Sequence, residues 1–308
     1  MSQQVRITLW GCPRTCSSTC LKSMSKMPGG TQVLFELYTT AWHFGPERDL
    51  TIASTFPKEP EIDTELDESG VLTPDSRSGF HSSVCNYDFC KHQMEAPYLG
   101  KRLVFDKEMA SYVLPKFANL AEGYRHVFLI RDPNVVFPSW KKIVQEMRMV
   151  KHGENIALED LILDRQPADI MPAGLGFRET YEMYQHVMAK GLDVTVIDAE
   201  DLVADPKAVL TAFCRKMGLP YSDDLLAWDA GSAVTEDWVI SQRHKYILRN
   251  AKTLDVFRNS TGFHKPDHDE SSYAKMTEDV KRCVEVSMPY YQKMYEDRLK
   301  VELHSPNH

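Results

Sequence analysis

The chain has 308 residues, of which 43% are hydrophobic and 26% charged, so it has enough apolar side chains to bury one large core. Its formal net charge of −8 argues against nucleic acid or an anionic polysaccharide as a partner, because both are bound by basic surfaces. No apolar run comes near the roughly 20 residues that cross a bilayer, and the first residues lack the apolar core of a signal peptide. We therefore expect a cytoplasmic protein whose seven cysteines are reduced thiols.

Apolar runs typical of buried strands alternate with helical stretches along the chain. The strand candidates are 5–9, 33–37, 102–105, 126–130 and 194–197. This alternation predicts an α/β fold with a doubly wound, mainly parallel sheet of about five strands flanked by helices. The carboxyl-terminal third is expected to be helical, and its candidate helices are 236–250 and 277–299. We expect 1–308 to form a single domain, because the length and composition suit one core.

A loop rich in hydroxyl groups follows the first predicted strand and leads into a helix. Backbone N–H groups at the start of such a helix attract an anion, and Arg14 adds a positive charge. The loop is not a Walker A motif, because Cys16 and Ser17 stand where Gly and Lys would follow Gly11. Hydrolysis of ATP or GTP is therefore not expected. The alternative is that Arg14 is a surface arginine and the serines only cap the helix.

Residues 45–100 interrupt the alternation of strands and helices. The segment contains five prolines and an acidic run over 59–68, and few of its apolar residues follow a regular pattern. It reads either as a solvated loop or as an insertion between the second and third strands that folds as a lid over the strands' carboxyl ends.

A second anion site is indicated by the segment after the fourth predicted strand. Arg131 stands at the carboxyl end of that strand, Pro133 starts the next helix, and Ser139 lies about two helical turns further on. A cation and a hydroxyl in these places can hold a phosphate from two sides. Asp132 before Pro133 is also good capping chemistry, so a plain helix cap is the alternative.

These segments resemble those of sulfotransferases that use 3′-phosphoadenosine 5′-phosphosulfate (PAPS), enzymes with a P-loop NTPase-like fold. Residues 13–18 resemble the loop that holds the 5′-phosphosulfate, with Cys16 where the family usually has Gly. Arg131, Pro133 and Ser139 resemble the segment that binds the 3′-phosphate.

Two later segments add to the resemblance. Residues 199–206 are similar to a block found late in cytosolic sulfotransferases, although Ala199 replaces an aromatic residue that often helps to hold the adenine. Phe257 and Arg258 resemble the start of a segment that closes on the 3′-phosphate. A solvated loop arginine is the alternative for Arg258.

The resemblance implies an enzyme that moves a sulfuryl group from PAPS to a hydroxyl or amine of a small organic acceptor. The product of PAPS would be 3′-phosphoadenosine 5′-phosphate (PAP), and no metal is implied. The residues that the resemblance assigns to the cofactor are Pro13, Arg14, Thr15, Cys16, Ser17, Ser18, Arg131, Ser139 and Arg258.

Catalytic roles follow from the same resemblance. Arg14 and Lys107 would stabilise the charge on the transferred group and on the leaving phosphate. Met109 stands where the cytosolic enzymes have a histidine base, so the base must come from elsewhere. The candidates are Glu36, which we favour, His43 and Glu108. We expect burial to raise the pKa of Glu36, although this carboxylate could instead form an ion pair with a neighbour such as Arg14.

Two other functions stay open. A small-molecule kinase of the P-loop type would bind ATP with Mg²⁺ in preference to PAP. A catalytically inactive protein would bind PAP or another nucleotide without turning over any acceptor. In each case the expected partner is a small molecule rather than a nucleic acid or a membrane, and a homodimer is left open.

Overall fold

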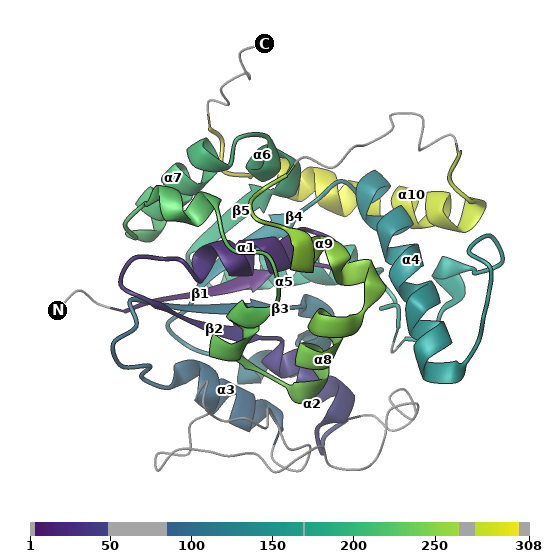
Figure 1. Ribbon diagram of the computed structural model, residues 1–308, viewed down its shortest axis with the longest axis horizontal. Coiled ribbons are helices and arrows are strands. Elements are labelled where there is room, and N and C mark those ends of the chain that lie inside the picture. Colours follow the sequence, from purple (N-terminus) through teal and green to yellow (C-terminus); the bar gives the residue numbers. More distant parts are fainter. Residues whose placement is uncertain (1–3, 49–84, 169, 265–274, 302–308) are drawn as a thin grey trace.

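The computed structural model describes residues 4–48, 85–168, 170–264 and 275–301 (Figure 1). Six strands in these residues form one sheet in the order β5–β4–β1–β3–β2–β6, and every pairing is parallel. The strands are β1 (Val5–Trp10), β2 (Thr31–Phe35), β3 (Leu103–Glu108), β4 (Arg125–Ile130), β5 (Val194–Asp198) and β6 (Trp238–Ile240).

Helices cover both faces of the sheet (Figure 1). The α-helices are α1 (Ser17–Met24), α2 (Leu37–Phe44), α3 (Tyr87–Glu95), α4 (Pro133–His152), α5 (Phe177–Ala189), α6 (Ala199–Ala204), α7 (Pro206–Met217), α8 (Gln242–Asn250), α9 (Asp255–Asn259) and α10 (Glu278–Glu296). Short 3₁₀ helices lie at Ala110–Tyr112, Leu114–Asn119, Leu163–Arg165, Asp223–Leu226, Ala233–Asp237 and Lys252–Leu254.

Alternate side chains of each strand enter two different apolar cores. Leu9 and Phe35 pack on one face with residues of α1, α6, α7, α8 and α9. Trp10 and Leu34 pack on the opposite face with residues of α2, α3, α5 and α10. A sheet that is buried on both faces explains why its strands read as nearly continuous apolar runs in the sequence.

The predicted fold class is confirmed: the sheet is parallel and doubly wound, and the carboxyl-terminal third is largely helical. All five predicted strands are present with shifted ends. The second one ends at Phe35 rather than at residue 37, because Glu36 adopts a left-handed conformation (φ 53°) that turns the chain into α2. The predicted helix over 277–299 corresponds to α10.

The prediction of one helix over 236–250 was wrong in its first part. Trp238, Val239 and Ile240 form the sixth strand, which pairs with β2 at the margin of the sheet. The Ser241 hydroxyl then accepts a hydrogen bond from the backbone N–H of His244 and so caps α8. The helix is therefore shorter than expected, and its first turn lies at the carboxyl end of a strand.

Most of the predicted insertion over 45–100 lies outside the described residues, since 49–84 are not described. Its described part includes α3, which packs Tyr87, Cys90 and Met94 into the core that also holds Trp10. Whether the segment forms a lid therefore stays a prediction.

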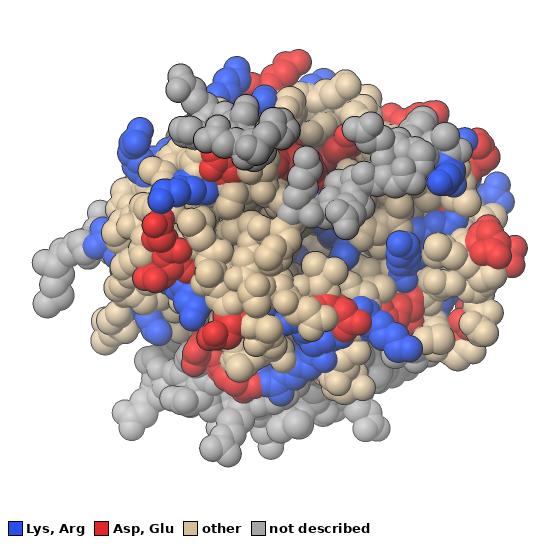
Figure 2. Space-filling model, turned by 45° about the horizontal axis from the view of Figure 1, so that its top comes forward, with Lys and Arg blue, Asp and Glu red and all other residues tan. Residues whose placement is uncertain are grey.

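Acidic and basic side chains are interspersed over the face shown in Figure 2. None of the helices in the described ranges combines the length and the apolar character needed to cross a membrane. All seven cysteines fall within those ranges and have free thiols.

Candidate functional site

The carboxyl ends of all six strands lie along one edge of the sheet, and each end carries a polar or charged group. In the order of the strands from β5 to β6, these groups are Asp198 and Glu200, Arg131, the loop after Trp10, Lys107, Glu36, and Ser241 with His244. Ligands of doubly wound sheets bind at this edge. The candidate site is therefore a row whose order follows the sheet rather than the chain.

The loop between β1 and α1 has the backbone shape of an anion-binding turn. Arg14 (φ 71°) and Cys16 (φ 64°) both adopt left-handed conformations, and Cys16 directly precedes the first residue of α1. The buried Thr15 hydroxyl donates to the Cys12 carbonyl at 2.9 Å. Cys16 therefore has the conformation that a glycine would adopt without strain, so the departure from the family's Gly has not removed the turn.

Two arginines and a serine from two segments far apart in the sequence meet at this loop. The Nε of Arg14 donates to Ser139 Oγ at 2.7 Å, and Arg131 Nη1 donates to the Arg14 carbonyl at 3.1 Å. Burial and the nearby charge of Arg131 lower the pKa of Arg14. An anion bound between the two guanidinium groups would relieve this repulsion.

The side chains of Arg131 and Asp132 have different hydrogen-bond partners. Arg131 is buried, and its Nε donates to Glu200 Oε1 at 2.8 Å. The helix α4 is capped by Asp132, whose carboxylate accepts a hydrogen bond from the Asn134 backbone N–H. Capping was the alternative interpretation of this segment, but it engages Asp132 and not Arg131.

A cavity of about 730 Å³ opens beside these groups. Six of the residues predicted to bind the cofactor line it: Arg14, Cys16, Ser17, Ser18, Arg131 and Ser139. Its other lining residues include Asn134, Lys142, Phe257, Ser260, Phe263 and His264, most of which the sequence did not single out. Lys142 could have been found, because it lies three residues after Ser139 on the same helix and therefore on the same face.

Three predicted binding residues do not line the cavity as far as the described residues define it: Pro13, Thr15 and Arg258. Arg258 instead donates to the carbonyls of Leu248 and Ala251, at 3.1 and 2.8 Å, and pairs with Asp255. Its guanidinium therefore closes the carboxyl end of α8, where unpaired carbonyls attract a cation. Contact between Arg258 and a phosphate was predicted, and this geometry does not support it.

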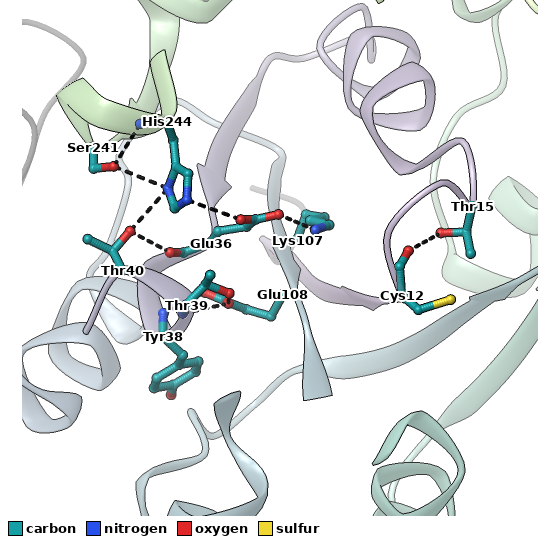
Figure 3. A network of polar contacts seen from close by, with 10 residues as sticks. All are labelled: Cys12, Thr15, Glu36, Tyr38, Thr39, Thr40, Lys107, Glu108, Ser241 and His244. Atoms are coloured by element: carbon teal, nitrogen blue, oxygen red, sulfur yellow. Dashed lines mark hydrogen bonds and ion pairs between the residues drawn. The ribbon is translucent and has the colours of Figure 1, made fainter. Parts of the chain in front are cut away.

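Further along the edge, Glu36 is held between two basic side chains (Figure 3). One of its oxygens accepts a short hydrogen bond from Lys107 Nζ, and the other lies 3.4 Å from His244 Nε2. The ion pair that was the alternative interpretation of Glu36 is thus present, with Lys107 rather than Arg14 as the partner. The sequence did not single out His244, for which the available signal was the apolar run 238–240 followed by a serine cap.

The pKa of Glu36 moves in the direction opposite to the one expected. Burial acts to raise it, but the charges of Lys107 and His244 and the hydrogen bond from Lys107 together lower it. Glu36 is therefore a carboxylate at neutral pH. The expectation failed because the sequence shows the apolar strand but not the cations that the neighbouring strands supply.

The other two base candidates have different surroundings. Glu108 is buried and accepts hydrogen bonds from the backbone N–H groups of Tyr38 and Thr39 at the start of α2. Burial raises the pKa of Glu108 to about 8. His43 is also buried, and its ring contacts those of Trp42 and Tyr112, with ring centres 4.6 and 4.8 Å away.

In the row of strand ends, Lys107 lies between the loop after β1 and Glu36 at the end of β2. Burial raises the pKa of the Cys12 thiol to about 12, and the positive charges of Lys107 and Arg131 act to lower that pKa. Both cations are therefore close to Cys12, at the start of the loop. The backbone joins the same parts, since Gly11 N–H donates to the Glu108 carbonyl and Glu36 N–H to the Lys107 carbonyl. The loop between β1 and α1 is therefore adjacent to the Glu36 cluster, which consists of Glu36, Lys107 and His244.

Known proteins resemble this chain in sequence and in fold. The family model described as a sulfotransferase domain matches residues 162–298. This match covers a little under half of the chain and makes that part similar to a sulfotransferase domain. Among solved structures, the chain is similar in fold to mouse sulfotransferase SULT7A1 complexed with PAP, at 10% identity, a TM-score of 0.50, and coverage of 97% of this chain and 91% of that one.

Two curated proteins of Arabidopsis thaliana are similar in sequence to this chain. They are named branched-chain-amino-acid aminotransferase-like proteins 2 and 1, and each is 24% identical to it, over 92% and 78% of its length. The chain spans only 40% and 34% of their lengths.

Proposed function

We propose that this chain is a sulfotransferase that uses PAPS as donor and transfers its sulfuryl group to a hydroxyl or amine of a small organic acceptor. One observation carries the proposal: Arg14 from the loop after β1, and Arg131 and Ser139 from the segment after β4, converge on a single cavity beside a helix start. Cations and hydroxyls in that arrangement suit a nucleotide with anionic groups at two ends. The mouse sulfotransferase of similar fold forms a complex with PAP, which agrees with this donor.

The donor occupies the β5–β4–β1 half of the row in this proposal. Arg131 and Ser139 hold the 3′-phosphate, and residues 13–18 hold the 5′-phosphosulfate at the start of α1. Phe257 and Phe263 line the same cavity and offer apolar surface to the rest of the nucleotide.

The acceptor lies over the β3–β2–β6 half, next to Lys107 and Glu36. An acceptor oxygen or nitrogen forms a bond to sulfur while the bond between sulfur and the 5′-phosphate oxygen breaks, and that oxygen keeps the electron pair. Arg14, Lys107 and the loop N–H groups stabilise the charge on the phosphate. The acceptor proton passes to a base, for which we propose Glu36, because it is ionised at neutral pH and adjoins the phosphate loop.

The alternatives to Glu36 are weaker on this geometry. Burial raises the pKa of Glu108 to about 8, and its carboxyl group is engaged by the backbone N–H groups at the start of α2, so it is less available as a base. His43 is surrounded by aromatic rings. An inactive PAP-binding protein is the second candidate function, and it is favoured by the ion pair that already engages Glu36.

Thermal unfolding with PAP, with ADP and with ADP plus Mg²⁺ tests the donor class. A ligand at about 100 times its dissociation constant stabilises by roughly 2.7 kcal/mol, which raises the melting temperature by several degrees. We expect this shift with PAP alone, and its loss in Arg131→Ala. Tyr246→Ala is the control, because Tyr246 is exposed and lies outside the cavity lining.

The other outcomes separate the rival functions. A shift only with the Mg²⁺-nucleotide would replace the proposal by a small-molecule kinase. A PAP shift without turnover of PAPS, on a panel of a phenol, an alkanol and an alkylamine, would favour the inactive binding protein. No shift with any of the three ligands would mean that the loop and Arg131 serve only the fold.

A further inference from the structure

The short strand β6 places His244 at the edge of the sheet where the carboxyl ends of the strands lie. It lies in the first turn of α8, and its imidazole packs edge-on against Phe35, with ring centres 5.7 Å apart. The side chain is only 13% exposed. It therefore stands at the floor of the site beside β2 and not on the outer surface of the helix.

Both ring nitrogens of His244 face fixed polar groups (Figure 3). Nδ1 lies 3.2 Å from Thr40 Oγ1 and 3.1 Å from Ser241 Oγ, while Nε2 lies 3.4 Å from Glu36 Oε2. Thr40 and Ser241 are themselves buried, and the Thr40 hydroxyl donates to the Glu36 carbonyl at 2.8 Å. These partners come from α2 and from the end of β6, so the orientation of the imidazole is set from both sides.

The position of His244 determines where the Glu36 carboxylate lies. Glu36 follows a strand end in a left-handed conformation, and its two oxygens point to different partners, Lys107 and His244. Figure 3 shows these two basic side chains on opposite sides of the carboxylate. Without a donor on the His244 side, the carboxylate would be held by Lys107 alone and could rotate about its side-chain torsions.

We propose that His244 is a positioning residue for sulfuryl transfer. By donating a hydrogen bond from Nε2, it holds the Glu36 carboxylate against Lys107 and keeps both groups beside the loop that follows β1. This inference rests on the proposed function. It adds to that function the residue that orients the Glu36 carboxylate on the acceptor side of the site. His244 acts through Glu36, so its loss lowers the rate of transfer and leaves the binding of the nucleotide intact.

The test compares two amide substitutions of similar polarity. The amide nitrogen of His244→Gln can reach the place of Nε2, whereas that of His244→Asn reaches only the place of Nδ1. A hydrogen bond to a charged group contributes about 1.5–3 kcal/mol, so its loss corresponds to a 10- to 100-fold fall in rate. We expect a fall of that size in kcat for His244→Asn and His244→Ala, and recovery to within about threefold for His244→Gln.

Binding measurements accompany the kinetics. The dissociation constant of PAP, measured by calorimetry, is expected to stay within about twofold of wild type in all three variants, as in the control Tyr246→Ala on the same helix. Each rate is measured with the acceptor of the phenol, alkanol and alkylamine panel that wild type turns over fastest. If His244 had only a structural role, the Gln and Asn variants would have the same kcat, because both keep a polar side chain.

The outcomes separate this inference from the proposed function. Equal kcat for the Gln and Asn variants, or weakened PAP binding in both, would overturn the positioning role while wild-type turnover still supported the sulfotransferase. If wild type binds PAP but turns over no acceptor, the proposed function fails, and the positioning role fails with it.

Discussion

Arg14 Nε lies 2.7 Å from Ser139 Oγ, and this hydrogen bond joins the loop after β1 to the first turns of α4. The two elements are predicted to bind opposite ends of one nucleotide. We expect Ser139→Ala to weaken PAP binding about 10- to 100-fold, because it removes a hydroxyl ligand and frees the Arg14 side chain. Titration calorimetry measures the effect. Ser139→Thr keeps the hydroxyl and should retain most of the affinity, and equal affinity of Ala and wild type would contradict the assignment.

The left-handed conformation of Cys16 gives a prediction about stability. Cys16→Val places a β-branched side chain at φ 64° and should lower the free energy of unfolding by about 1–2 kcal/mol. Cys16→Gly adopts the same conformation without strain and should keep both stability and PAP binding close to wild type. Urea unfolding of the three proteins tests this order, and a destabilised glycine variant would show that the thiol itself is needed.

A buried histidine on β4 predicts how stability depends on pH. Trp10 Nε1 donates to His126 Nδ1 at 3.0 Å, which requires that nitrogen to be unprotonated. Burial lowers the pKa of His126 to about 4, below the value of about 6.5 in an unfolded chain. The unfolded state therefore binds the proton more readily between these values, and stability falls as the pH falls from about 6.5 toward 4.

The expected contribution of His126 to this loss is about 2 kcal/mol by pH 5. His126→Asn can still accept from Trp10 but does not titrate in this range. The difference between the unfolding free energies of wild type and variant, measured by urea titration at pH 7 and pH 5, should shrink by that amount. An unchanged difference would show that His126 is protonated in the folded protein.

A buried ion pair ties α4 to α10. Lys141 Nζ lies 2.9 Å from Asp279 Oδ2, both residues are buried, and the same carboxylate accepts from the Leu163 backbone N–H. Removing one charge leaves the other unpaired, so Lys141→Met and Asp279→Asn should each cost about 3 kcal/mol in urea unfolding. The double variant should cost clearly less than the sum, and an additive result would mean that the two charges are not coupled.

The sequence predicted most of the fold because five strands are long apolar runs, which only a doubly buried sheet explains. It missed β6, which has three residues and depends on pairing with β2 for its conformation. In isolation, Trp238 and Ile240 fit the apolar face of the following helix equally well. The pairing of these residues with β2 makes them a strand rather than part of the helix, and no local pattern in the sequence encodes that pairing.

The residues proposed to hold the donor could be named from the sequence, whereas the full set of groups around Glu36 could not. Residues 13–18 and the pair Arg131 and Ser139 are each contained in a short segment, so a local pattern can single them out. His244 lies more than 200 residues from Glu36, and their contact exists only because β6 is placed next to β2. The direction of the pKa shift of Glu36 was mistaken for the same reason.

The sheet order also has a kinetic consequence. In the proposed function the nucleotide binds over β5, β4 and β1, whereas the acceptor binds over β3, β2 and the outermost strand β6. The two substrates then occupy different strand ends, and neither place lies within the other. We therefore expect the ternary complex to assemble in either order, with the two half-sites filling independently until the sulfuryl group is exchanged between them.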